Sequence, residues 1–148
     1  YAILANGGKA VQPHLVRKIV KNGEVLADFS DYRAVEQVLS PSICETVIRS
    51  MKFVTKEGGN SKRADIPGYT EAGKSGTAEK IIDGRYSKDH NISSFLGIAP
   101  ANTPRFVLLV SIDDPEKKRI PGVGGQQFGG ISAAPVFRDI AVLSLQYL

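Results

Sequence analysis

The sequence predicts an α+β fold in which an antiparallel sheet packs against helices. Short apolar, β-branched runs follow one another after residue 68, joined by tight turns, and this spacing favours antiparallel strands. Apolar residues at helical spacing occur before these runs, in residues 40–59, and after them, in residues 132–148. Helices on either side of a run of strands are typical of an α+β arrangement and not of alternating βαβ units.

The first residues predict the end of a helix. Residues 1–5 are mostly apolar, and Asn6, Gly7 and Gly8 follow them, residues that tolerate the left-handed conformation found at helix C-termini. A chain of 148 residues is long enough for one domain with its own core. We nevertheless expect it to be a C-terminal piece of something larger, because a helix under way at the first residue implies structure upstream.

A β-hairpin is expected over residues 13–29. Asn22 and Gly23 stand between two apolar runs, and this pair favours a type I′ turn, which needs positive φ at both positions. A linker follows the hairpin and leads to the first long helix.

That helix is expected over residues 40–59. Ser40 can cap its first turn, and Pro41 fits the first helical position, where a missing N–H costs nothing. Cys44 lies beside the apolar face and is interpreted as a small buried side chain. As the only cysteine, it cannot form a disulfide within the chain.

Three strands are expected next, over residues 68–82, 92–99 and 106–112. Asp83-Gly84 marks the turn between the first two. Charged and then glycine-rich residues follow, and we expect the loop over residues 116–127 to be mobile.

The chain closes with a predicted helix over residues 132–148. Its expected apolar face consists of Val136, Phe137, Ile140, Leu143 and Tyr147.

Composition excludes several functions. The net charge is 19 − 15 = +4, without a run of five or six like charges, so nothing indicates nucleic-acid binding. His14 and His90 are isolated, so no metal site and no cofactor are expected. No apolar run approaches the ~18 residues of a membrane-spanning helix.

Residues 68–80, GYTEAGKSGTAEK, fit two motifs that share Lys74. Residues 68–75 match the phosphate loop of nucleotide hydrolases. Asp113 follows an apolar run, as a magnesium-binding aspartate does at the end of a strand in such proteins. That motif needs a buried strand before it and a helix starting at the lysine. Neither pattern is present, so the phosphate loop is disfavoured.

The alternative interpretation places Lys74 in a strand. Glycine weakens a strand unless something must approach its backbone, as a peptide does when it pairs with an exposed sheet edge. An ammonium group and the hydroxyls of Ser75 and Thr77 can hold a substrate carboxylate, and a backbone N–H can stabilise an oxyanion. On this segment alone, a glycine-containing edge strand with a surface lysine is equally compatible.

Four stretches in order carry a family resemblance. Ala72 to Ala78, AGKSGTA, resembles the K-[ST]-G-T-[AG] strand of the penicillin-binding protein transpeptidase domain, and YAILANGGKAVQP at residues 1–13 resembles the helix end before its small hairpin. Two further stretches resemble the same family. One is the helix at residues 40–59 followed by IPG at residues 66–68, and the other is GGISAAPVF at residues 129–137. The class B, monofunctional members are the most similar. The resemblance covers essentially the whole chain and implies the C-terminal portion of the penicillin-binding protein/serine β-lactamase-like transpeptidase fold.

The resemblance implies a site and a reaction. In the family, a serine attacks the penultimate D-alanine carbonyl of a peptidoglycan stem peptide, D-alanine leaves, and an amine resolves the acyl-enzyme into a crosslink. By resemblance, Lys74 supports the nucleophile, Ser75 and Thr77 bind the substrate or antibiotic carboxylate, Gly76 keeps the strand open to the ligand, and the Thr77 backbone N–H donates to the oxyanion.

The sequence departs from the full pattern. No lysine has a serine three positions before it, and no asparagine has a serine two positions before it, so the S-x-x-K and S-x-N motifs are absent. Family order places both upstream of Tyr1. We therefore expect this chain to supply one wall of the active site and to be inactive alone.

The implied partners are the D-Ala-D-Ala stem peptide, β-lactam antibiotics and proteins of the cell-wall synthesis machinery, with no nucleic acid. The implied location is the extracytoplasmic face of the bacterial inner membrane, with the anchor outside this chain. A serine β-lactamase or β-lactam sensor relative is the alternative within the fold, a phosphate-loop hydrolase the alternative outside it, and a non-catalytic scaffold remains conceivable.

Overall fold

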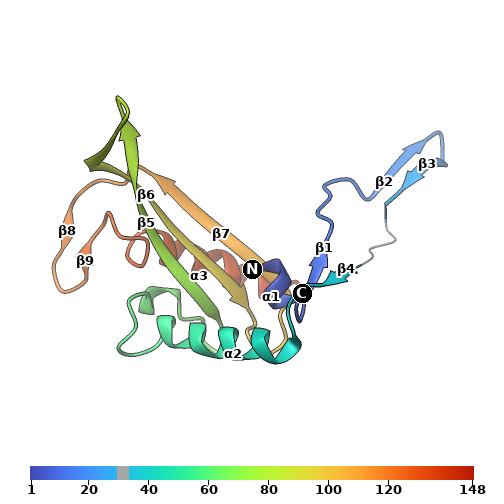
Figure 1. Cartoon of the computed structure of the whole chain (residues 1–148), viewed down its shortest axis with the longest axis horizontal. Helices are drawn as coiled ribbons and strands as arrows, with labels where there is room; N and C mark the ends of the chain where they lie inside the picture. Colours follow the sequence, from blue (N-terminus) through green and yellow to red (C-terminus); the bar gives the residue numbers. More distant parts are fainter. Residues whose placement is uncertain (30–33) are drawn as a thin grey trace.

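A three-stranded antiparallel sheet forms the centre of the protein (Figure 1). The computed structural model describes residues 1–29 and 34–148. The sheet has the order β5-β6-β7, with β5 at Ala72–Ile82, β6 at Arg85–Ala99 and β7 at Phe106–Asp113. The α+β class predicted from the sequence is confirmed.

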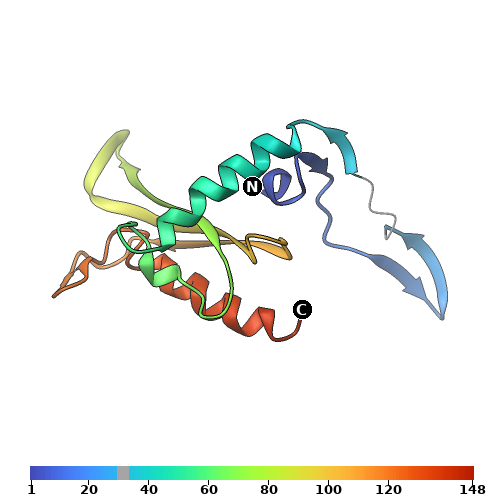
Figure 2. The same cartoon turned by 90° about the horizontal axis from the view of Figure 1, so that it is seen from below.

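Two helices cover opposite faces of this sheet (Figure 2). Residues of β6 point to the two faces of the sheet in turn. Phe95 packs in one buried cluster with α3 (Ala133–Leu145), and Ile98 packs in another with α2 (Pro41–Met51). This parity follows from the two-residue period of a strand. Burial on both faces explains why the second half of β6 is almost continuously apolar.

Helix α2 is shorter than predicted. Ser40 caps it by accepting a hydrogen bond from the Ile43 N–H, as expected, but the α-helix ends at Met51 instead of reaching Gly59. Two short 3₁₀ helices follow, η1 at Lys52–Thr55 and η2 at Lys62–Ala64. Cys44 is buried, which confirms its interpretation as a small core side chain.

The predicted hairpin is confirmed as β2 (Lys18–Lys21) and β3 (Glu24–Asp28). Asn22 and Gly23 have φ values of 52° and 85°, the double positive φ that a type I′ turn requires. A second pairing was not predicted. The strand before the hairpin, β1 (Lys9–Val11), pairs with the strand after it, β4 (Ala34–Gln37). Residues 9–29 and 34–37 form what we call the arm, which projects from the body on the side opposite β8 and β9 (Figure 1).

The strand expected at residues 92–99 begins earlier, at Arg85. Residues 85–91 are polar and carry no apolar signal, but they pair with the end of β5 beyond the Asp83-Gly84 turn. The loop expected to be mobile contains two short paired strands, β8 (Arg119–Ile120) and β9 (Gly124–Gly125). Its mobility stays a prediction.

The apolar face predicted for the last helix is wrong in most of its members. Of the predicted set, Phe137 is fully buried, whereas Leu143 and Tyr147 are 60% and 89% exposed. The face that packs on the sheet is instead built largely from alanine. It consists of Ala133, Ala134, Phe137, Ala141 and Leu145.

Close packing explains this choice. The Phe137 ring lies against the Cα of Gly97 on β6, where a Cβ atom would collide with it. The same ring meets Phe95 in a tilted pair with centroids 5.0 Å apart. Small residues on α3 let the helix come this near to the sheet.

Candidate functional site

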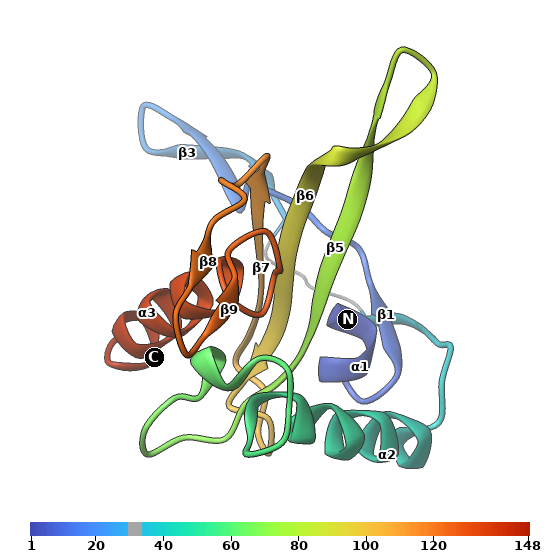
Figure 3. The same cartoon turned by 90° about the vertical axis from the view of Figure 1, so that its left-hand side faces the viewer.

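The four predicted site residues lie together on β5, the edge strand of the three-stranded sheet (Figure 3). Lys74 to Thr77 pair in regular antiparallel register with Leu96 to Ser93. A phosphate loop requires a helix starting at its lysine, so the strand contradicts that interpretation. Among the described residues, β5 pairs with β6 alone, and its other edge has no strand partner.

Lys74 is solvent-exposed on this edge. Its ammonium group donates a 2.7 Å hydrogen bond to the carbonyl oxygen of Ser75. The side chain is thus folded back along its own strand, and no carboxylate holds it in any interaction the structure shows. A cation in this position can turn towards an incoming anionic ligand.

Ser75 and Thr77 each contact a residue that the sequence did not indicate. The Ser75 hydroxyl lies 3.4 Å from Oδ1 of Asn60, which also accepts a 3.0 Å hydrogen bond from Ser61. The Gly129 N–H donates a long, 3.4 Å hydrogen bond to the Thr77 hydroxyl. Asn60 and Gly129 are far from residues 74–77 in sequence, so only the folded chain brings them there.

Backbone segments approach closely around Gly76 and Gly129. A Cβ atom on Gly76 would lie 2.6 Å from the Ser94 hydroxyl, and one on Gly129 would lie 2.5 Å from the Gly76 carbonyl oxygen. Glycine is therefore required by packing at position 129, where the neighbours are backbone atoms, whereas at position 76 the Ser94 hydroxyl could rotate away. Whether Gly76 also keeps the strand open to a ligand stays a prediction.

A buried carboxylate anchors the start of β5. Glu71 is fully buried and accepts hydrogen bonds from the Thr55 hydroxyl at 2.5 Å and from the Ile66 N–H at 3.2 Å. Lys56 forms a 2.9 Å ion pair with the same carboxylate and contacts Asp65. Desolvation lowers the pKa of Lys56, but hydrogen bonds and charge attraction from Asp65 and Glu71 outweigh it, and the pKa is raised overall.

The contacts of Glu71 do not include any of the predicted site residues. Glu71 lies three residues before Lys74. Its carboxylate is paired with Lys56 and accepts hydrogen bonds from Thr55 and Ile66. The ion pair joins the residue that follows η1 to the residue that precedes β5.

The loop after β7 is held against the same strands. Asn91, on β6, donates a 2.9 Å hydrogen bond to the Gln127 carbonyl oxygen and a 3.0 Å bond to the Ser93 hydroxyl. The Ser93 hydroxyl donates to the same Gln127 carbonyl. Asn91 and Ser93 are 5% and 0% exposed, so their ends of both contacts are buried, while Gln127 is half-buried.

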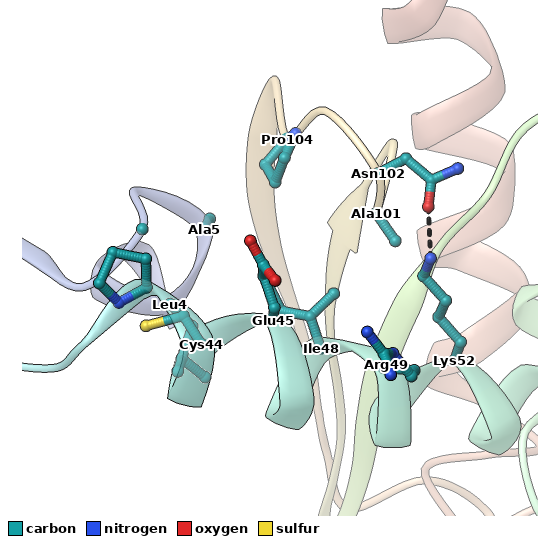
Figure 4. Close-up of a pocket in the computed structure, with 12 residues that line it drawn as sticks. Leu4, Ala5, Cys44, Glu45, Ile48, Arg49, Lys52, Ala101, Asn102 and Pro104 are labelled. Carbon is teal, nitrogen blue, oxygen red and sulfur yellow. Dashed lines mark hydrogen bonds between the residues drawn. The ribbon is translucent and has the colours of Figure 1, made fainter.

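A separate hollow lies between α1 (Ala2–Ala5), α2 and the turn at residues 101–104 (Figure 4). Its volume is about 330 Å³, and Cys44 and Ile48 contribute to its wall. Lys52 and Asn102 meet across it in a hydrogen bond. None of the predicted site residues lines it.

No group of metal-ligating side chains occurs within residues 1–29 and 34–148. In the same part of the chain, no helix is long and apolar enough to span a membrane.

Known proteins match this arrangement over most of the chain. The family model described as the penicillin binding protein transpeptidase domain matches residues 1–141. A probable peptidoglycan D,D-transpeptidase, PbpC of Pseudomonas aeruginosa, is 36% identical over 148 residues, which is 100% of this chain and 23% of the relative. The peptidoglycan D,D-transpeptidase FtsI of Escherichia coli is 43% identical over 106 residues, 71% of this chain and 17% of the relative.

Solved structures agree. Penicillin-binding protein 3 of Mycobacterium tuberculosis, solved with aztreonam, matches with a TM-score of 0.79 and 29% identity, over 98% of this chain and 33% of that one. The transpeptidase domain of Burkholderia pseudomallei penicillin-binding protein 3 matches with a TM-score of 0.73 and 30% identity, over 99% of this chain and 40% of that one. The chain thus spans at most about a quarter of these two curated relatives.

Proposed function

Because the chain belongs to the penicillin-binding protein transpeptidase family, we propose that it forms one wall of the substrate site of a peptidoglycan D,D-transpeptidase. The observation that carries this proposal is the exposed edge strand on which Lys74, Ser75 and Thr77 lie together. An extended peptide that pairs with this edge places its own carboxylate beside an ammonium group and two hydroxyls.

Each residue has a proposed role. Ser75 and Thr77 donate hydroxyl protons to the terminal carboxylate of the D-Ala-D-Ala stem peptide, or to the carboxylate of a β-lactam. Lys74 supplies positive charge beside the reacting groups. The Thr77 backbone N–H donates to the oxygen that becomes negative when the carbonyl is attacked, where one such donor is worth about 10²–10³ in rate.

The nucleophile is proposed to lie outside these 148 residues, because no S-x-x-K or S-x-N motif occurs among them. A serine oxygen supplied from there bonds to the penultimate D-alanine carbonyl carbon, the C–N bond breaks, and the departing amine takes a proton. An acceptor amine then displaces the serine oxygen and completes the crosslink. The chain acts as the C-terminal part of a transpeptidase domain whose N-terminal part carries the serine.

The partners and the location follow from the same assignment. Aztreonam and ampicillin are bound by the M. tuberculosis neighbour, and we propose that β-lactams bind here in the same way. The class B members to which this chain is similar work in cell-wall synthesis, so we place the protein at the extracytoplasmic face of the inner membrane, anchored by a segment outside this chain. Proteins of the cell-wall synthesis machinery are its proposed neighbours.

Acylation by a fluorescent penicillin tests the proposal in the full-length protein. Thr77→Val removes one hydroxyl donor to the ligand carboxylate, and we expect about a tenfold lower acylation efficiency, the effect of one charge-assisted hydrogen bond. Ser111→Ala, on the exposed surface of β7, is the matched control and should leave the rate unchanged. A penicillin methyl ester lacks the free carboxylate, so it should acylate the unchanged protein slowly. Its acylation rate should fall little further in Thr77→Val.

Two results contradict the proposal. One is a Thr77→Val protein that is folded and acylated at the unchanged rate. The other is a stable covalent adduct between fluorescent penicillin and the 148-residue chain alone, because that adduct requires a nucleophile within the chain.

A further inference from the structure

We propose that Asn91 and Ser93 are positioning residues that hold the loop after β7 against Thr77, and so make Gly129 part of the carboxylate-binding site. The inference rests on the proposed function of Thr77 and goes beyond it, because it assigns a role to two buried polar side chains that contact no substrate. Residues 115–130, which connect β7 to α3, are called the return loop below.

The first step of the argument is the convergence of two donors on one carbonyl. The Asn91 amide and the Ser93 hydroxyl both donate to the Gln127 carbonyl oxygen, and the Asn91 amide also donates to the Ser93 hydroxyl. Asn91 Oδ1 is buried without a hydrogen-bond partner, so the side chain is held through its amide nitrogen. Because buried donors are expensive to leave unpaired, these hydrogen bonds resist rotation of the Asn91 and Ser93 side chains. The Gln127 carbonyl is therefore fixed relative to β6.

The second step is the short distance along the chain from Gln127 to Gly129. Gly129 donates to the Thr77 hydroxyl, and its carbonyl oxygen accepts from the N–H groups of Ala133 and Ala134 at the start of α3. Its Cα lies against the carbonyl oxygens of Gly76 and Ser94. With Gln127 fixed on one side and α3 on the other, Gly129 has little freedom to leave Thr77.

The third step is the chemistry of a hydroxyl group. A threonine hydroxyl has one proton to donate and lone pairs to accept with. Because the Gly129 N–H occupies a lone pair of Thr77 Oγ1, the hydroxyl proton is left to point elsewhere. The proton thus stays available for a carboxylate oxygen, while the Gly129 N–H limits where the hydroxyl oxygen lies before a ligand arrives.

A second contact ties the beginning of the return loop to the same β5–β6 hairpin. Lys117 contacts the Lys88 carbonyl and lies 3.3 Å from a carboxylate oxygen of Asp89. These residues are exposed, so this contact is weaker than the buried one. Loss of the Asn91 and Ser93 hydrogen bonds, more than loss of the Lys117 contact, should therefore change the position of Gly129 relative to Thr77.

The test is a double-mutant cycle in the full-length protein, with acylation by fluorescent penicillin as the readout. Ser93→Ala and Asn91→Ala each remove hydrogen bonds to Gln127, and we expect acylation efficiency to fall about two- to tenfold in each variant. In a Thr77→Val background the same substitutions should change the rate by less than about twofold, because they act through the missing hydroxyl. Ser111→Ala is again the control, since it also removes a serine hydroxyl from the central sheet.

A second measurement does not depend on catalysis. Hydrogen exchange of the Gly129 amide should accelerate in Ser93→Ala and Asn91→Ala, while the amides of β6 from Gly97 to Ala99 keep their protection. If those β6 amides also accelerate, the variants have loosened the fold and the positioning role is rejected.

The outcomes separate the two proposals. Equal losses with and without the Thr77 hydroxyl overturn the positioning role and leave the function of Thr77 standing, as does an unchanged acylation rate in Ser93→Ala and Asn91→Ala. A folded Thr77→Val protein with unchanged acylation instead overturns the proposed function itself.

Discussion

The arm and the central sheet are both antiparallel β-structure, but different interactions hold them. In the sheet, Phe95, Ile98 and Ala99 are completely inaccessible to solvent. In the arm, no described side chain is buried, and Val20 and Leu26 are 56% and 58% exposed. The arm thus depends on its turn and its backbone ladder, whereas the sheet depends on packing. The proposed site lies on the edge strand of the packed sheet and not on the arm.

A matched pair of phenylalanines should show the largest difference. Phe137→Ala removes a fully buried ring that contacts Phe95 and should lower the free energy of unfolding by about 3–5 kcal/mol. Phe29→Ala, in the arm where the ring is 48% exposed, should change it by about 0.5 kcal/mol or less. Urea unfolding of the chain measures both, and comparable losses would show that the arm is packed after all.

A matched pair of glutamates should show the next largest effect. Glu71→Gln leaves Lys56 without its buried counter-charge and weakens the Thr55 contact, and we expect a loss of about 2 kcal/mol, moderated because Lys56 is half exposed. Glu24→Gln at the exposed end of the arm hairpin should be nearly neutral. If both substitutions prove neutral in urea unfolding, Glu71 does not stabilise the entry of β5.

One substitution should affect the arm more than the body. Gly23 has a φ of 85°, so Gly23→Ala strains the turn by about 1 kcal/mol. Because none of the arm's described side chains is buried, the loss should appear as faster amide exchange in β2 and β3 only. Faster exchange in β6 as well would mean that arm and body unfold together.

The smallest effect should be electrostatic. A 2.6 Å hydrogen bond from His90 holds the pKa of Asp114 below its ordinary value of 3.8. Asp114 therefore contributes stability that is present above pH 3.8 and is lost as the pH falls through the lower pKa of the folded state. His90→Ala should raise the Asp114 pKa, measured by carboxyl NMR titration, whereas His14→Ala in the arm should not change it.

The sequence predicted those parts of the molecule that local chemistry determines. Asn22-Gly23 specified its turn, and Ser40 specified its cap. These signals are local because each follows from the φ preference or the hydrogen-bonding group of one residue.

The features that were missed depend on distant partners. Alanine carries a weak apolar signal, so the packed face of α3 was assigned to larger side chains that prove exposed, such as Leu143. Asn60, Asn91 and Ser93 are ordinary polar residues in sequence, and their contacts join segments far apart in the chain. Gly129 was noted only as part of a family stretch, because its contact with Thr77 appears only in the folded chain.

The alanine face of α3 also has a consequence for mutational tolerance. Ala133, Ala134 and Ala141 leave no room for a larger side chain, while Val136, Ile140 and Leu143 on the outer surface have open space beside them. In a scan that substitutes every residue of this helix, the fraction of tolerated substitutions should therefore vary with the period of the helix. Bulky replacements should be eliminated at the three alanines and accepted at the three larger residues, the reverse of what hydrophobicity alone suggests.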